Sequence, residues 1–374
     1  MKLPPSKIPF RTELSLAPDR WTADDRKIPS LDGLRAISIL LVLIGHLLLP
    51  SNLGGIGGFG VVVFFFISGF LITRLLLAEI KTTGTISITH FYLRRVLRLY
   101  PVIIASISLC LGFAVLMSRP VDLIEVGSVF LYFTNYLNAY REFHPVVPTL
   151  PLGAFWSLSI EEHFYLIFPA IFLFLKGNPL RIAYVAIATC VICLALRCAY
   201  LVAWPEMIGT LSTYWRSETR FDAIAFGVLM AVLAEMSSGQ KIILWTIKPK
   251  VVIAASIALL ISFAYRNKFY QDSVRFSIQD IALFSIIGCV IFSAHFAFAN
   301  RFLNSAIISW VGKLSYSLYV WHGAVVYLLT GITLAYIPSF AHFPFLFVCS
   351  FGAASLSYYL LEVPLVRTRR KLRS

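Results

Sequence analysis

Charged side chains are scarce in this sequence, and acidic ones are the scarcest. Asp, Glu, Lys and Arg make up 13% of the 374 residues, whereas hydrophobic residues make up 59%. Soluble domains carry about 25% charged residues. A chain with so few charges cannot cover its surface with polar groups in water. The composition therefore excludes a soluble globular protein and predicts a polytopic protein whose solvent is lipid.

Acidic residues are outnumbered by basic ones, 18 against 32, which gives a net charge of +14. Basic loops held on the cytoplasmic side of a membrane explain this excess without a nucleic-acid partner, and an anionic ligand near that face is a further reading. The first thirty residues have no apolar core, so we expect a cytoplasmic tail there and not a secretory signal peptide. All six cysteines fall in apolar stretches, so we expect buried hydrophobes and no metal site.

A transmembrane helix needs about 20 mainly apolar residues. Eleven apolar segments can be drawn as candidate spans: 33–50, 58–79, 99–118, 123–139, 154–175, 182–203, 219–236, 251–265, 278–298, 308–330 and 343–361. Both tails are basic and are expected in the cytoplasm, which requires an even number of spans. If 123–139 does not cross, every predicted cytoplasmic loop is basic. We therefore predict ten spans, with 119–153 as an external segment that is either re-entrant or interfacial.

The predicted fold is an all-α membrane protein of about ten transmembrane helices bundled around a polar intramembrane cavity. Residues 31–362 form the membrane domain, 1–30 a cytoplasmic N-terminal tail and 363–374 a basic cytoplasmic C-terminal tail. The expected location is the bacterial inner membrane. Three basic residues run against this topology because it places them outside, namely Arg266, Lys268 and Arg275.

Ionisable residues inside spans are costly and are candidates for function. The first predicted span carries Asp32 and Arg35 at its start, three residues apart, and His46 deep within it. Arg35 and His46 are eleven residues apart, so they share one helix face at a separation of about 16 Å. The plain alternative is an arginine that reaches the interface and a histidine bonded to a neighbouring helix.

The span that begins near Trp156 carries Glu161, Glu162 and His163 in succession. In the predicted topology this helix enters from outside, which places Glu161 about 10 Å below the outer edge. His46 enters from the other side and lies about 20 Å from the inner edge. In a hydrocarbon core about 30 Å thick the two side chains reach the same depth. We therefore expect a general-base dyad of histidine and carboxylate.

Arg95 and Arg98 lie one helical turn apart in an amphipathic cytoplasmic stretch. Two guanidinium groups at this spacing can hold a phosphate bidentately. Binding to anionic lipid headgroups is the alternative for the same two residues.

Four further polar side chains are weaker candidates. Ser68 follows a glycine-containing apolar run and can instead bond its own backbone, while Arg220 and Asp222 can pair with each other. His322 lies at a depth similar to that of His46 and can line the same cavity, although a lone histidine there is more often a core residue.

Taken together, these segments resemble the acyltransferase-3 family of integral membrane O-acyltransferases. Seven elements match in the family's order and cover nearly the whole chain: LDGLRAISILLVLIGH at 31–46, GVVVFFFISGFLIT at 60–73, FYLRRVLRLYP at 91–101, FWSLSIEEHFYLIFP at 155–169, RFDAIAFG at 220–227, GKLSYSLYVWH at 312–322 and LEVP at 361–364.

The resemblance implies a ten-span enzyme that takes an acyl group from cytoplasmic acyl-CoA, commonly acetyl-CoA. It implies an acceptor hydroxyl on a cell-surface, lipid-linked or exported saccharide, or in some members on a small molecule such as a macrolide. Many members carry a fused extracytoplasmic hydrolase-like domain. This chain stops after its last predicted span, so a second transfer step is expected to use a separate extracytoplasmic partner.

The resemblance also assigns roles to residues. The family's intramembrane histidine corresponds to His46 and the arginine eleven residues before it to Arg35. The family's RxxR element corresponds to Arg95 and Arg98, and its WSLSxE carboxylate to Glu161. The remaining candidates for the substrate site, the oxyanion site or the cavity wall are Asp32, Ser68, Trp156, Arg220, Asp222, Tyr319 and His322.

The expected reaction is transfer within a ternary complex, with no metal. The arginines hold the phosphates of acyl-CoA, and the pantetheine arm runs from Arg35 to His46. His46, supported by Glu161, then removes the proton of the acceptor hydroxyl, while Ser68, Tyr319 or a backbone N–H stabilises the oxyanion. An acyl-enzyme on Ser68 or His46 is the competing scheme.

Two other classes of function remain open. A multi-span transporter of a small anionic solute also places ionisable groups within spans. No inverted repeat is visible, however, and paired arginines on a cytoplasmic loop have no evident role in one. A non-catalytic membrane partner or sensor is the third class, and it predicts that His46→Ala leaves function intact.

Overall fold

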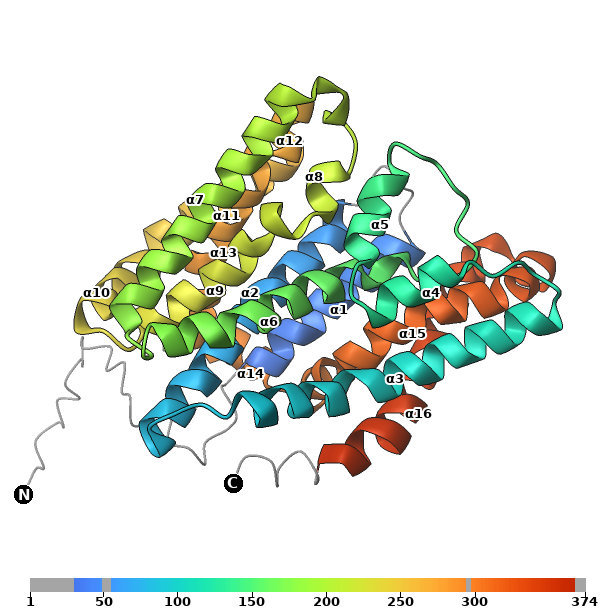
Figure 1. Ribbon diagram of the computed structural model, residues 1–374, viewed down its shortest axis with the longest axis horizontal. Coiled ribbons are helices and arrows are strands. Elements are labelled where there is room, and N and C mark those ends of the chain that lie inside the picture. The colour runs from blue at the N-terminus through green and yellow to red at the C-terminus, as the bar shows by residue number, and fades with distance from the viewer. Residues whose placement is uncertain (1–29, 49–54, 294–296, 367–374) are drawn as a thin grey trace, which may run out of the picture.

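The computed structural model describes residues 30–48, 55–293 and 297–366, and every regular element in these ranges is a helix (Figure 1). The helices are α1 (Leu31–Leu47), α2 (Gly55–Thr83), α3 (Ile88–Leu116), α4 (Leu123–Phe130), α5 (Thr134–Arg141), α6 (Trp156–Phe174), α7 (Pro179–Ala203), α8 (Ser212–Trp215), α9 (Phe221–Leu233), α10 (Ser237–Thr246), α11 (Pro249–Ala264), α12 (Lys268–Asp272), α13 (Val274–Phe292), α14 (Ala297–Leu303), α15 (Ala306–Tyr336) and α16 (His342–Ser357), which continues as a π-helical turn (Tyr358–Glu362). Almost all of the predicted N-terminal tail and most of the C-terminal tail lie outside the described residues.

Six of these helices are long and apolar enough to cross a membrane, and a seventh span results if α10 and α11, which meet at 65°, are counted together. The protein is therefore an all-helical, multi-pass membrane protein. Apolar side chains on the outer helices face away from the bundle, among them Leu109 on α3, Val191 on α7 and Leu260 on α11. Exposed apolar surface of this extent suits contact with lipid.

The segment 123–139 does not form one continuous helix. It contains α4 and most of α5, each of which has eight residues and is about 12 Å long. Neither helix is long enough for a hydrocarbon core of about 30 Å. The predicted span 219–236 is also shorter than expected, because α9 covers only 13 residues and short turns precede it.

Glycines bring the first two helices into backbone contact. A Cβ atom on Gly45 would lie 2.6 Å from Cα of Gly57, and one on Gly60 would lie 2.6 Å from the carbonyl oxygen of Ser38. Only glycine allows two helices to approach this closely. The two contacts also show that α1 and α2 run antiparallel, so that the C-terminal end of α1 meets the start of α2.

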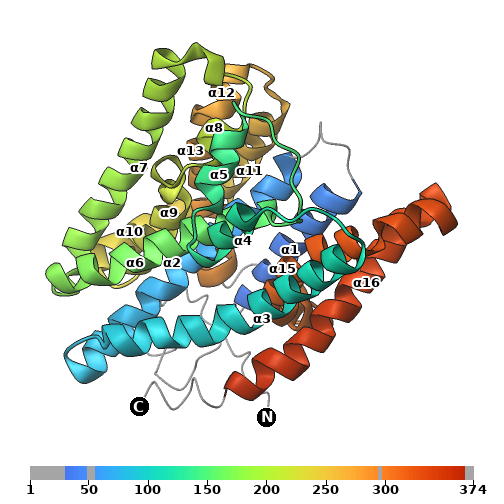
Figure 2. The ribbon, with the colours of Figure 1, turned by 45° about the vertical axis from the view of Figure 1, so that its right-hand side comes forward.

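The long helix α15 runs parallel to α1. Gly312 packs directly against the backbone of Asp32 near the starts of both helices, and His322 meets His46 further along. The helix α3 lies along α15 in the same direction, because Tyr316 donates to the carbonyl of Leu99 (2.6 Å) and the rings of Phe113 and Tyr327 are in contact. Figure 2 shows α3, α15 and α16 together on one side of the molecule.

On the other side α2 packs against α9, again through glycine. A Cβ on Gly227 would lie 2.7 Å from the backbone nitrogen of Phe70. Arg74 of α2 then pairs with Glu235, just beyond the C-terminal end of α9, at 2.9 Å, so these two helices are parallel. The helix α2 is thereby buried between α1 and α9 at the centre of the bundle (Figure 1).

Candidate active site

Two histidines from different helices form the centre of the site. His46, at the end of α1, meets His322 of α15 edge to edge, with ring centroids 5.1 Å apart and planes at 18°. Nδ1 of His46 lies 2.9 Å from Nε2 of His322. His322 is 3% exposed, whereas His46 is exposed and lines a pocket. The structure therefore brings these two predicted residues together.

The pocket over His46 has a volume of about 450 Å³. Its wall combines the indoles of Trp156 and Trp215 with polar side chains of the segment 119–153, including Asn138 and Glu142. A pocket of this size can hold a small molecule or one or two rings of a larger one. Trp156, predicted as a cavity residue, thus lies in the pocket wall.

The wall of the pocket is fixed by a buried carboxylate. Glu125 of α4 is 2% exposed and accepts hydrogen bonds from the backbone N–H groups of Thr149 (3.1 Å) and Leu150 (2.9 Å). The same carboxylate pairs with Arg141 of α5 at 2.8 Å. The segment 119–153 is therefore folded back on itself as a cap over the pocket.

Tyr319 holds the start of α6. Its hydroxyl lies 2.6 Å from both the carbonyl oxygen of Ala154 and the hydroxyl of Ser157. Since a carbonyl only accepts, the Tyr319 proton goes to Ala154 and Ser157 donates to Tyr319. Tyr319 therefore has no free proton for an oxyanion and serves instead to position the wall of the pocket.

Glu161 does not lie beside His46. It accepts hydrogen bonds from Ser68 (3.2 Å) and Tyr165 (3.4 Å). His46 packs at Gly57, and Ser68 is eleven residues further along α2, which corresponds to about 16 Å. The prediction that His46 and Glu161 share one depth was wrong, and so was the dyad built on it.

The reason lies in the position of α6. We expected this helix to begin at the outer edge, but Trp156, its first residue, packs against Phe65, which is ten residues into α2. The preceding segment 119–153 enters the bundle first, so Glu161 is displaced toward the Arg35 end of α1. Ser68, which donates to Glu161, is likewise distant from His46.

Glu161 instead joins the three predicted arginines, which we call the arginine cluster: Arg35, Arg95 and Arg98. The guanidinium carbon of Arg95 lies 3.2 Å from the ring centroid of Tyr165, the residue that donates to Glu161. Arg95 also pairs with Glu162 at 3.6 Å. Arg98 interacts electrostatically with Arg35 and with Glu161, while Arg35 is 3.6 Å from Asp32.

Arg220 and Asp222 do not pair with each other. Asp222 pairs with Arg197 of α7 at 2.6 Å, and both side chains are fully buried. The guanidinium carbon of Arg220 lies 4.1 Å from the ring centroid of Phe276. Arg197 and the nearby buried Asp280 were not among the residues predicted from the sequence. Both could have been identified, because each is a charged residue within an apolar span.

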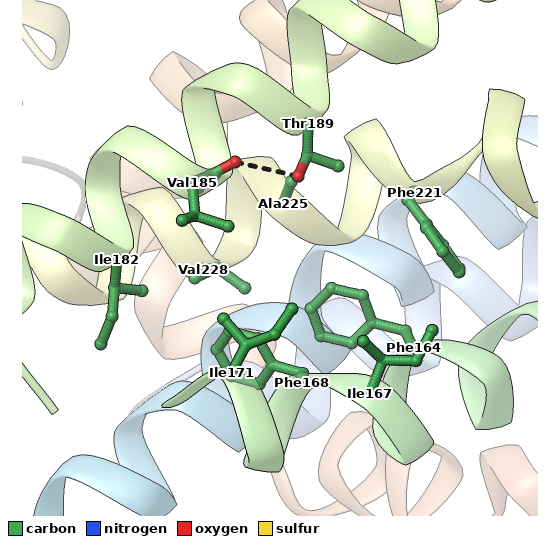
Figure 3. Close-up of a pocket in the computed structure, with 11 residues that line it drawn as sticks. Phe164, Ile167, Phe168, Ile171, Ile182, Val185, Thr189, Phe221, Ala225 and Val228 are labelled. Carbon is green, nitrogen blue, oxygen red and sulfur yellow. Dashed lines mark hydrogen bonds between the residues drawn. The ribbon is translucent and has the colours of Figure 1, made fainter. Parts of the chain in front are cut away.

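A second pocket lies between α6, α7 and α9 and is almost wholly apolar (Figure 3). Phe164, Phe168 and Val228 are among the side chains that line it. The hydroxyl of Thr189 is turned back to its own helix and donates to the carbonyl of Val185 at 2.9 Å. This pocket carries no group for acid–base or nucleophilic chemistry.

Within the described residues, no three His, Cys, Asp or Glu side chains are grouped so that they could hold a metal ion.

The geometry defines a membrane protein with a histidine below a capped pocket and an arginine cluster about 16 Å away along the same helix. Residues 28–359 match the family model described as an acyltransferase domain. The chain therefore belongs to the acyltransferase-3 family, as the sequence motifs indicated.

Curated relatives point the same way. The chain is similar to the O-acetyltransferase OatA of Staphylococcus aureus strain NCTC 8325, with 29% identity over 361 residues. A relative from strain COL, whose name also contains the term O-acetyltransferase, is 30% identical over 360 residues. In both cases the match covers 91% of this chain, and the chain spans 57% of the relative's length. No solved structure matches the chain.

Proposed function

We propose that the protein is an O-acyltransferase that moves an acyl group, in the first instance acetyl, from acyl-CoA to a hydroxyl group of a saccharide. The observation that carries this proposal is the arrangement of α1. This helix carries Arg35, a member of the arginine cluster, near its start and His46, which is open to a pocket, at its end. Donor and acceptor can then approach His46 from opposite sides.

The donor site is the arginine cluster. Arg35, Arg95 and Arg98 lie together at one end of the bundle, where guanidinium groups can hold the phosphates of CoA. The separation of about 16 Å between Arg35 and His46 is on the order of the length of an extended pantetheine arm. The thioester carbon of a donor held in this way reaches His46.

The acceptor site is the capped pocket. The half-buried indole of Trp215 offers an apolar surface for the ring of a saccharide, and Asn138 and Glu142 offer hydrogen-bonding groups for its hydroxyls. A mixture of aromatic walls and a few polar groups is typical of small-molecule sites. The hydroxyl to be acylated would lie against His46.

In the proposed reaction, His46 removes the proton of the acceptor hydroxyl as its oxygen attacks the thioester carbon. A C–O bond forms, the C–S bond breaks and CoA leaves as the thiol. Direct transfer is favoured over an acyl-enzyme on Ser68, because that hydroxyl lies with Glu161, about 16 Å along α2 from the histidine. Glu161 is assigned to the donor site, where its carboxylate offsets the charge of the arginines.

The same proposal includes ten membrane crossings, made by α1, α2, α3, α6, α7, α9, α11, α13, α15 and α16. Alternate crossing would direct α1, α3 and α15 one way and α2 and α9 the other, in agreement with the helix contacts described above. Both termini would then be cytoplasmic, with the arginine cluster on the cytoplasmic side of a bacterial inner membrane.

Acyl transfer can be tested before the acceptor is known. Membranes that contain the protein are supplied with radiolabelled acetyl-CoA, and the label released from the saccharide fraction by mild base is counted, because O-acyl esters are base-labile and amides are not. We expect His46→Ala to abolish the label and His90→Ala, an exposed histidine on α3, to leave it unchanged. Label that persists in His46→Ala contradicts the proposal, and solute uptake without acetyl-CoA consumption would favour the transporter.

A further inference from the structure

The hydrogen bonds around His322 determine which of its nitrogens carries a proton. Nδ1 lies 2.7 Å from the carbonyl oxygen of Tyr319 and 3.3 Å from that of Leu318. Carbonyl oxygens only accept, so Nδ1 of His322 is the protonated nitrogen. In the neutral ring Nε2 is then the acceptor. The neutral ring is the more stable form here, because His322 is 3% exposed and burial of an unpaired charge is unfavourable.

The tautomer of His46 follows from that of His322. Its Nδ1 lies 2.9 Å from the acceptor Nε2 of His322, so Nδ1 of His46 must donate. The proton of neutral His46 is therefore on Nδ1, and the lone pair is on Nε2. Since Nδ1 is occupied by His322 and His46 lines the pocket, Nε2 is the nitrogen left for an acceptor hydroxyl.

We infer that His322 is a positioning residue, which fixes the tautomer and the ring plane of His46 so that Nε2 is the basic atom facing the pocket. This inference rests on the proposed function. From the sequence we expected Glu161 to support His46. In the structure, His322 orients His46 without a carboxylate. The two rings are nearly coplanar, at 18° to each other, so the hydrogen bond between them restricts the rotation of His46 as well as its protonation.

The same chain of bonds determines where the proton goes. When Nε2 of His46 takes the proton of the acceptor hydroxyl, the new positive charge is stabilised by the hydrogen bond from Nδ1–H to His322. The proton cannot continue past His322, because its Nδ1–H ends on the carbonyl oxygen of Tyr319. It must leave from Nε2 of His46, and the sulfur of the departing CoA thiolate is the base to which it goes. His46 thus acts first as base and then as acid at one atom.

The test uses two substitutions of similar size. His322→Leu removes the acceptor for Nδ1–H of His46. His322→Gln keeps an acceptor, because the amide oxygen of glutamine reaches the place of Nε2. Hydrogen bonds to charged groups are the stronger kind, so we expect His322→Leu to lower kcat about 10- to 100-fold with little change in the KM for acetyl-CoA. We expect His322→Gln to recover most of that loss. Equal losses in both variants, or full turnover in His322→Leu, would overturn the inference.

A second measurement does not depend on activity. The ¹⁵N resonances of imidazole nitrogens distinguish protonated from unprotonated nitrogens in histidine-labelled protein, and His46→Gln assigns the signals of His46. We expect protonated Nδ1 and unprotonated Nε2 in the wild type and in His322→Gln, and a mixture of tautomers in His322→Leu. The opposite tautomer in the wild type would refute the inference even if a variant fails to fold. If the tautomer is as expected but His46→Gln still transfers label, the proposed function fails instead.

Discussion

Glu161 accepts a hydrogen bond from Ser68 at 3.2 Å, and its carboxylate lies beside the arginine cluster. The expected effect of removing its charge follows from this position. Ser68 and Tyr165 donate to different oxygens of this carboxylate, so Glu161→Gln keeps an acceptor for only one of them. It also no longer offsets the guanidinium groups, which then repel one another and lose their fixed arrangement. We predict about tenfold weaker acyl-CoA binding, measured by calorimetry, in a protein that remains folded.

The matched control is Glu79→Gln, which removes a carboxylate paired with Arg94 at 3.3 Å outside the arginine cluster. It should leave acyl-CoA binding close to that of the wild type, because neither partner of this ion pair belongs to the arginine cluster. If Glu161→Gln keeps its acyl-CoA affinity but shows a large fall in kcat, Glu161 does not support acyl-CoA binding. That result would favour Glu161 as the partner of His46 in catalysis.

The glycine contact between α1 and α2 should be intolerant of even one methyl group. In Gly45→Ala the new Cβ would lie 2.6 Å from Cα of Gly57, so the helices must separate and His46 must move. We predict a destabilisation of about 1–3 kcal/mol, seen as a lower Tm in detergent, and a larger loss of transfer activity. Gly112→Ala on α3 meets nothing within 4 Å and should lower neither quantity, because alanine favours the helix more than glycine does. Equal losses in the two variants would contradict the contact.

The cap over the pocket should depend on Glu125. Glu125→Gln removes the charge that pairs with Arg141 and turns an amide N–H₂ toward backbone donors. Breaking one partner of a buried ion pair costs about 3–5 kcal/mol, so we predict faster proteolysis within 142–150 and weaker acceptor use. Acyl-CoA binding should be unchanged. The control is Glu206→Gln, at an exposed position. If the cap in Glu125→Gln resists protease as well as the wild-type cap does, Glu125 does not hold the cap in place.

The buried pair of Arg197 and Asp222 predicts a non-additive result. Arg197→Met alone leaves a buried carboxylate without its partner and should lower the free energy of unfolding by about 3–5 kcal/mol. The double variant Arg197→Met/Asp222→Asn removes both charges and should lose less than the single one. Thermal unfolding of the three proteins measures the difference. Equal losses in the single and double variants would show that the pair is not coupled.

Much of the fold was predictable because the bilayer restricts the chain to apolar helices, whose residues are visible in the sequence. The grouping of Arg35, Arg95 and Arg98 was foreseen from their spacing and from the family motifs. The nearness of His322 to His46 followed from counting turns along two helices that enter from the same side.

The position of Glu161 could not be predicted in this way. Its depth was counted from an assumed start of α6 at the membrane edge, and that start depends on how 119–153 folds. The fold of that segment is fixed by contacts between residues far apart in sequence, such as Glu125 with Leu150. A depth count carries no information on such contacts, and the partner of Asp222 was missed for the same reason.

The most direct test of the account is acyl-CoA binding to the purified protein by calorimetry. It compares the wild type with Arg95→Ala/Arg98→Ala and with His46→Ala. We predict that the wild type binds, that the double arginine variant loses binding, and that His46→Ala binds as the wild type does while transferring nothing. A wild-type protein that does not bind acyl-CoA, or a double arginine variant that binds it as tightly as the wild type, would contradict the division of the site between an arginine cluster and His46.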